Sequence, residues 1–136
     1  MRAPGDWTLD HLFAGRPAAF ELFRVVRAFI ESLGPVVVDV MKTPVSFGVQ
    51  TKFAWIWLPQ QFTTKRPDQS ITLTFDLDHR VEDERIAEAV EPRPGRWTHH
   101  VVIERPEDLD EHVKGWLAEA YELGALDRRT RGGGAG

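Results

Sequence analysis

The order in which apolar patterns follow one another constrains the fold of this chain more than any other feature. Apolar residues recur with helical spacing over residues 17–33 and again over residues 106–124, and all β-type sequence lies between these segments. Each helical segment is apolar along one stripe, so each has a single face to bury. Two such helices can share one side of an antiparallel sheet. The chain is therefore predicted to be an α+β protein with its N- and C-terminal helices on one face of a mainly antiparallel sheet.

Residues that favour helix boundaries locate the ends of both helices. Pro17 suits the first turn of the first helix, and Gly34 and Pro35 follow its last turn. The second helix is expected to start directly after Pro106, whose ring also suits a first turn. Thr8 is a good N-cap, and it predicts a short helical turn ahead of the first long helix.

Five segments between the helices have the composition of β-strands, rich in β-branched and aromatic residues. They cover residues 36–40, 45–49, 53–58, 71–77 and 97–103. Only a short turn separates the second from the third, so these two are predicted to form an antiparallel hairpin. Residues 81–95 fit either a short helix or an edge strand. The whole pattern predicts a two-layer α-β(5)-α domain.

The third predicted strand has no polar side. Its alternation places Phe53, Trp55 and Trp57 on one face, and the residues between and after them are apolar as well. Two explanations remain open. In the first, other apolar residues cover the second face of the sheet. These are Trp7, Leu12, Phe13 and Phe62. In the second, an aromatic surface is exposed and binds a ligand or a second copy of the chain.

Composition and charge limit the domain organisation and the kind of partner. With 136 residues, 42% hydrophobic residues and a formal net charge of −4, the chain is expected to fold as a single domain over residues 1–125. Residues 126–136 contain three arginines and end in glycines, which predicts a flexible tail. An acidic body binds nucleic-acid phosphates poorly, so a nucleic-acid partner is disfavoured.

Cysteine content and hydropathy bear on the location of the protein. The chain has no cysteine, which excludes disulfides and thiolate chemistry and suits the reducing cytoplasm. It shows neither a signal-peptide pattern nor a run of about 18 apolar residues, so no insertion into a membrane is expected. A cytoplasmic protein is predicted.

Few residues indicate chemistry. Successive residues of a strand face opposite ways, so His99 and His100 cannot jointly bind one metal ion, and His99 is expected on the buried face. Asp76, Asp78 and His79 could offer metal ligands, but nothing else in the sequence joins them. No metal and no cofactor are therefore predicted. The serines lie in no nucleophile motif and no glycine-rich phosphate loop precedes a helix, so enzymatic activity is not favoured, although residues from distant strands can converge on a site.

Three short motifs carry a resemblance to known families. They are residues 51–54 (Thr-Lys-Phe-Ala), residues 96–101 (Arg-Trp-Thr-His-His-Val) and residues 116–123 of the second long helix. In these the chain resembles the MmcQ/YjbR-like proteins, small bacterial domains with a CyaY-like α+β fold. It looks still closer to an uncharacterised bacterial domain family, and the YdhG-like proteins share its helix–strands–helix outline more loosely. The resemblance implies the fold, and for function it implies only the DNA binding proposed for the MmcQ/YjbR group.

The sequence therefore predicts a small binding or interaction module whose ligand, a small molecule or a protein, is unknown. The candidate binding residues lie on or beside the sheet face of the third strand. They are Lys42, Lys52, Trp55, Trp57, Thr72, Thr74 and His100. The alternatives are an enzyme with a site on the same face and a nucleic-acid-binding protein. A homodimer through the aromatic face would also remove its apolar surface from water.

Overall fold

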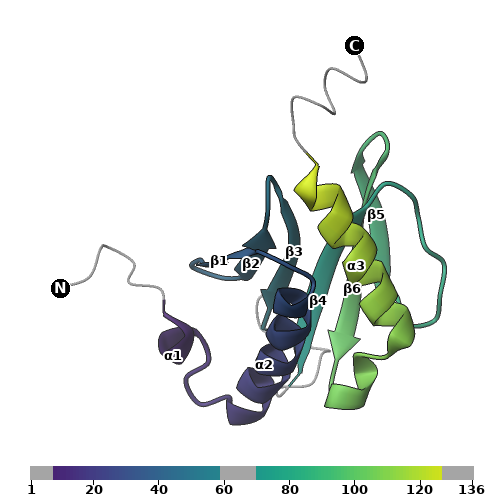
Figure 1. The fold of residues 1–136 in the computed structure, drawn as a ribbon. Helices are drawn as coiled ribbons and strands as arrows, with labels where there is room; N and C mark the ends of the chain where they lie inside the picture. Colours follow the sequence, from purple (N-terminus) through teal and green to yellow (C-terminus); the bar gives the residue numbers. More distant parts are fainter. Residues whose placement is uncertain (1–7, 59–69, 127–136) are drawn as a thin grey trace.

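Figure 1 shows the computed structural model of the chain, which describes residues 8–58 and 70–126. Along the chain, a short helix and a long helix are followed by six strands and a second long helix. The predicted tail, apart from Leu126, and the predicted covering residues Trp7 and Phe62 lie outside the described residues. None of the helices in the described part combines the length and the apolar character needed to cross a membrane.

The first two helices lie where their boundary residues place them. In α1 (Leu9–Leu12), the side chain of Thr8 accepts a hydrogen bond from the backbone N–H of His11 at 3.1 Å and caps the helix. α2 (Pro17–Ser32) begins at the predicted proline and buries its apolar stripe. The buried members of that stripe include Leu22, Phe23, Val26 and Ile30. The opposite face of α2 carries charged residues, as amphipathic spacing requires.

α3 (Glu111–Ala125) starts later than the sequence predicts. Pro106–Asp108 forms a separate 3-10 turn, and Asp110 is the N-cap of the helix. The Asp110 carboxylate accepts hydrogen bonds from the backbone N–H groups of His112 and Val113, both at 3.0 Å. A proline ring suits the first turn of either kind of helix, so it does not by itself mark where the α-helix begins.

The sheet has six strands, one more than predicted, and every pair of neighbours is antiparallel. The order across the sheet is β1-β2-β3-β4-β6-β5. The strands are β1 (Val37–Val40), β2 (Val45–Gly48), β3 (Lys52–Trp57), β4 (Ile71–Leu77), β5 (Glu88–Arg93) and β6 (Arg96–Ile103). The five predicted strands are all present, and β2 and β3 form the predicted hairpin.

The sixth strand, β5, lies at the edge of the sheet beside β6 and corrects the predicted count of five. It falls in the segment for which the sequence left a short helix and an edge strand open. Its residues are mostly exposed and include Pro92. An edge strand pairs on one side only, so it tolerates proline and needs little apolar sequence. For this reason its composition resembles that of a loop.

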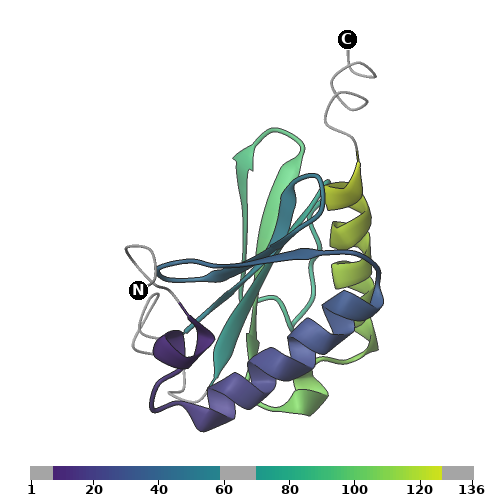
Figure 2. The same cartoon turned by 60° about the vertical axis from the view of Figure 1, so that its left-hand side comes forward.

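α2 and α3 pack against the same face of the sheet. The ring of Phe23 in α2 lies 6.3 Å from that of Phe47 in β2, and Trp116 in α3 stacks on Phe75 in β4 at 6.1 Å. Figure 2 shows the β1–β2 hairpin crossing the direction of the other strands steeply, and α1 beside the start of α2. The prediction of two plain layers is therefore only partly right.

Phe13, which the sequence offered as a cover for the second face of the sheet, joins the helix side instead. Its ring lies 5.3 Å from that of Phe20 and 5.2 Å from that of Phe23, both in α2. Leu12 also packs against this core. The residues just before α2 thus extend the core at the end of that helix.

A β-bulge between β2 and β3 changes the face on which Phe53 lies. The register shifts between Phe47 and Gly48, which leaves Phe53 as an extra residue in β3. Phe53 is buried beside α3, with its ring 5.5 Å from that of Tyr121. The prediction that Phe53 shares a face with the two tryptophans of β3 is therefore wrong, because simple alternation does not hold across a bulge.

Candidate functional site

One row of paired residues crosses the sheet on the face opposite the long helices. The register connects the row from β1 through all six strands to β5. Its members are Asp39, Ser46, Trp55, Thr74, His100 and Glu88. Paired residues of neighbouring strands share a face, so these six side chains lie on one surface, which we call the open face. Trp57 and Thr72 form a second pair beside them.

The open face combines buried hydroxyl groups with half-buried indoles. Ser46, Thr72 and Thr74 are buried, and Thr74 is only 3% exposed. Trp55 and Trp57 stand between these hydroxyl-bearing residues and are half-buried. Two indoles on adjacent positions of one strand face give a broad apolar surface, and the threonines give it a polar floor.

Three groups follow one another along the polar row, and the first two of them are joined by a hydrogen bond. Thr74 Oγ1 is joined to His100 Nδ1 by a hydrogen bond of 2.8 Å, and His100 Nε2 lies 3.9 Å from Glu88 Oε1. A hydroxyl, an imidazole and a carboxylate in this order form the arrangement of a nucleophile relay. The hydroxyl of Thr74, however, lies in the floor of the sheet, where it cannot approach a substrate carbonyl. The hydrogen bond to Thr74 therefore fixes the orientation of the His100 ring.

A largely buried carboxylate lies beside these groups on the same face. Asp76 accepts a hydrogen bond from Thr98 Oγ1 at 2.8 Å, and Arg96 Nη1 lies 3.9 Å from it. Burial raises the pKa of Asp76, and the hydrogen bond from Thr98 and the charge of Arg96 act in the opposite direction. The sequence considered Asp76 together with two later residues as metal ligands, but Asp76 is held by these partners on the open face.

The two lysines that the sequence proposed lie away from the centre of the open face. Lys52 Nζ lies 3.3 Å from Asp39 Oδ2, and the pair is exposed at the β1 end of the polar row. Lys42 lies in the turn between β1 and β2 and is exposed. Of the seven candidate residues, the register therefore gathers five on one face, places Lys52 at its margin and leaves Lys42 off the strands.

His99 lies on the helix side of the sheet, as its position in the strand predicts. It is fully buried, and its ring stacks on that of Phe75 at 5.3 Å. His99 Nε2 accepts a hydrogen bond from the backbone N–H of Val81 at 3.0 Å. Burial lowers the pKa of His99, so the ring is held neutral and holds the loop after β4 against the sheet.

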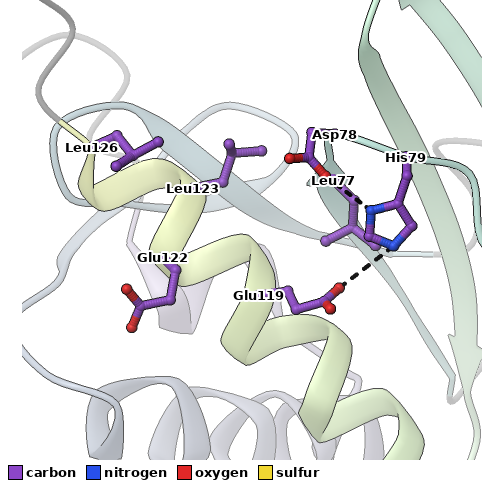
Figure 3. Close-up of a pocket in the computed structure, with 7 residues that line it drawn as sticks. All are labelled: Leu77, Asp78, His79, Glu119, Glu122, Leu123 and Leu126. Atoms are coloured by element: carbon purple, nitrogen blue, oxygen red, sulfur yellow. Dashed lines mark hydrogen bonds and ion pairs between the residues drawn. The ribbon is translucent and has the colours of Figure 1, made fainter. Parts of the chain in front are cut away.

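A second candidate site is a pocket between the end of β4 and the last turns of α3, which Figure 3 shows. The cavity measures about 340 Å3. Asp78 and His79 reach into it from the β4 side, and Glu119 reaches toward them from α3. His79 Nδ1 lies 2.9 Å from Asp78 Oδ1, and His79 Nε2 lies 3.7 Å from Glu119 Oε1. The hydrogen bond to His79 lowers the pKa of Asp78, which keeps that carboxyl ionised.

Sequence reasoning singled out Asp78 and His79 but missed the rest of this pocket. Glu119 and Leu123 come from α3, some forty residues further on, and Leu126 is the C-cap of that helix. Glu119 and Leu123 are four residues apart and therefore share one face of α3, which was the only available indication. Within residues 8–58 and 70–126, no three histidine or carboxylate side chains are placed to hold a metal ion.

Comparison with known proteins identifies the domain type. A family model described as a domain of unknown function, DUF5655, matches residues 9–124. No curated protein and no solved structure matches the chain. The match runs from the start of α1 to the last turn of α3 and covers both candidate sites apart from Leu126 of the pocket. It does not show the predicted similarity to MmcQ/YjbR-like proteins. The chain belongs to the DUF5655 family of domains of unknown function.

Proposed function

We propose that the protein is a binding module whose ligand lies against the open face, in contact with Trp55, Trp57 and His100 and with Thr72 and Thr74 beneath them. The observation that carries this proposal is the pairing of half-buried indoles with buried hydroxyls on a sheet face that the long helices leave uncovered.

The chemistry of the open face favours a small planar molecule with a polar edge. Indole rings bind flat rings by stacking, and they provide a large contact area with few rotatable bonds. His100 is held in one orientation by Thr74 and can donate or accept a hydrogen bond at the edge of such a ring. Lys52 is paired with Asp39 at the margin, and Arg96 faces Asp76, so both of these cations already have a carboxylate partner. We propose a cytoplasmic location, which the absence of cysteine supports.

Fragment binding followed by NMR tests this proposal. Planar heterocycles, with indole and adenine as first probes, are titrated while the indole N–H signals of Trp55 and Trp57 are observed. We expect these signals to shift, and His100→Gln and Trp55→Leu to weaken binding by roughly tenfold, the loss of one hydrogen bond or one stacking contact. Trp97→Leu is the matched control, because Trp97 lies on the helix side. Equal losses in Trp97→Leu and Trp55→Leu would contradict the proposal.

One observation favours a second candidate, an enzyme that uses His100 as a general base. The hydrogen bond of His100 Nδ1 to Thr74, with Glu88 3.9 Å from Nε2, orients the ring as catalytic histidines are oriented. In that case a bound probe is chemically converted by the wild type and left unchanged by His100→Gln. Binding of the probe without its conversion would support the binding module.

The nucleic-acid alternative is tested separately. Retention of the protein on heparin at low salt would favour it, although the net charge of −4 opposes it.

A further inference from the structure

The outer edge of β6 is only partly covered by β5. The pairing of the two strands reaches along β6 as far as His100, which lies opposite Glu88, the first residue of β5. The carbonyl of His100 also accepts a hydrogen bond from the backbone N–H of Ala87 at 2.7 Å, so the backbone groups of His100 point toward β5. Backbone groups of alternate residues in a strand point the same way. Those of Val102 therefore also point outward, past the start of β5.

The backbone of Val102 leaves a gap in this edge. Within the described residues, neither its N–H nor its C=O forms a hydrogen bond on the outer side. The next outward N–H, that of Glu104, donates to Asp108 Oδ2 at 2.8 Å. Native proteins usually cover or shorten a free sheet edge, because its unpaired backbone groups can add a further strand. We call this one-residue opening, with hydrogen bonds before and after it, the edge gap.

The edge gap opens into a cavity of about 460 Å3. Val101 and Val102 line it from β6, and its two walls are the loop before β5 and the segment that leads from β6 to α3. Arg85 in the first wall is joined to Asp110 in the second, with 2.6 Å between Arg85 Nε and Asp110 Oδ2. This ion pair fixes the two walls relative to each other, so the cavity exists before any ligand binds.

The cavity is acidic. The residues that line it include four carboxylates and one arginine. Asp110 is paired with Arg85, and Asp108 accepts hydrogen bonds from backbone N–H groups. Glu84 and Glu104 are exposed, and neither forms an ion pair within the part of the chain that the structure describes. Two carboxylates beside the edge gap are therefore available to a cationic partner.

We propose that the edge gap binds one residue of an extended basic peptide, which pairs with β6 in antiparallel orientation. The peptide residue opposite Val102 donates its N–H to the Val102 carbonyl and accepts the N–H of Val102 with its own C=O, as in any hydrogen-bonded pair of an antiparallel ladder. Lysine or arginine side chains next to that residue pair with Glu84 and Glu104. The gap lies at the sheet edge, and binding there does not rest on the proposed function.

Amide hydrogen exchange tests whether the gap exists. The N–H groups of Val101 and Ile103 point toward β4 and are bonded within the sheet, whereas that of Val102 is open. We expect Val102 to exchange at least about tenfold faster than these two neighbours in the free protein, and to slow when a peptide binds. Equal protection of the three amides in the free protein would show a closed edge and would end the proposal.

The binding test uses the full chain and three peptides. They are acetyl-Lys-Val-Lys-amide, the same peptide with an N-methyl group on its valine, and acetyl-Glu-Val-Glu-amide, each titrated while the backbone N–H signal of Val102 is observed by NMR. We expect the lysine peptide to shift this signal and to bind about tenfold more tightly than the N-methylated one, which lacks one hydrogen-bond donor. The glutamate peptide should bind weakest. Equal affinities of the first two peptides, or no shift at millimolar peptide, would overturn the proposal.

Two variants assign the charge contribution. Glu104→Gln removes a carboxylate from the cavity and is expected to weaken binding of the lysine peptide roughly three- to fivefold, the loss of one surface ion pair. Glu107→Gln, in the neighbouring 3-10 turn, changes the net charge equally outside the cavity and should leave binding unchanged. Both residues are exposed, so both variants should fold. Equal effects of the two variants would reduce the binding to a general attraction of opposite charges and refute the site.

Discussion

His99 is buried on the helix side with one ring nitrogen already engaged. Its Nε2 accepts the N–H of Val81, so protonation there would break that bond and place a charge beside Phe75. Burial lowers the pKa of His99 from its ordinary value of 6.5, and the nearby rings of His79 and His100 act in the same direction. The folded state therefore holds fewer protons than the unfolded state at slightly acidic pH.

Stability should depend on pH through His99. The free energy of unfolding is expected to be constant above pH 6.5 and to fall as the pH drops below it, because the unfolded chain takes up a proton that the folded chain refuses. Urea unfolding between about pH 5.2 and 7.5 measures this, above the range in which unperturbed carboxylates titrate. His99→Gln can still accept the Val81 N–H and should flatten the dependence.

The control for this experiment is His112→Gln, which removes an exposed ring from α3. It should keep the wild-type dependence on pH. A dependence that survives in His99→Gln would show that another group is responsible.

At the residue scale, the alternation of faces along a strand predicted where side chains lie better than residue type did. It placed His99 and His100 on opposite faces and joined Trp55 with Trp57, and all four lie accordingly. It failed at Phe53, because the bulge depends on how β2 pairs with β3 and leaves no mark within β3 itself.

At the scale of elements, α3 is tied to the β2–β3 turn at its last residues. The carbonyl of Gly124 accepts hydrogen bonds from the backbone N–H groups of Gln50 and Thr51, at 2.9 and 3.0 Å. A Cβ atom on Gly124 would lie 2.9 Å from the ring of Phe53 and 3.0 Å from the carbonyl oxygen of Thr51. The helix can approach the turn this closely only because residue 124 has no side chain.

Two glycines of α3 should respond in opposite ways to the same substitution. Gly124→Ala is expected to destabilise the fold by about 1–3 kcal/mol, since a backbone oxygen and a buried ring must move. Gly115→Ala meets no atom within 4 Å, so it should stabilise the fold by roughly 0.5–1 kcal/mol through helix propensity. Urea unfolding of both variants measures the difference. Stabilisation by both would mean that α3 does not pack against the turn as described.

The strands that the sequence located most clearly are those in which one face is apolar and the other is polar. β4 and β6 lie inside the sheet and place apolar residues on the helix side and polar residues on the open face, with His99 and Val102 of β6 as exceptions. β5 pairs on one side only and is mostly polar, so nothing in its composition separates it from a loop. The pocket beside α3 could not be foreseen for a related reason, because two elements distant in sequence build it.

At the scale of the whole molecule, the most exposed large apolar side chains of the described surface are scattered, and the indoles of Trp55 and Trp57 on the open face are half-buried. The large exposed apolar residues are Val37, Val90 and Leu126. Val37 lies on β1, Val90 lies on β5 and Leu126 follows α3. The strands β1 and β5 are at opposite edges of the sheet. A stable interface buries roughly 800 Å2 on each partner and is usually contiguous.

We therefore expect a monomer, although the sequence left a homodimer open. Light scattering at micromolar concentrations should give the mass of one chain for the wild type and for Trp55→Ser/Trp57→Ser. The double variant should lose about 2–4 kcal/mol of stability in a thermal melt, because both indoles are half-buried. A wild type of twice the mass, dissociated by the double variant into folded single chains, would instead make the open face a dimer interface.

The packing of α3 has a consequence for how the chain is made. A ribosome completes this helix after every strand of the sheet, yet α3 covers the central strands β3 and β4. Until residues 111–125 leave the exit tunnel, α3 does not cover Phe53 and Phe75 on the helix side of the sheet. Their exposed rings can then associate with other nascent chains. The sheet therefore gains its cover on this side only after α3 has been synthesised, and a chain truncated before α3 is expected to expose Phe53 and Phe75 and to aggregate.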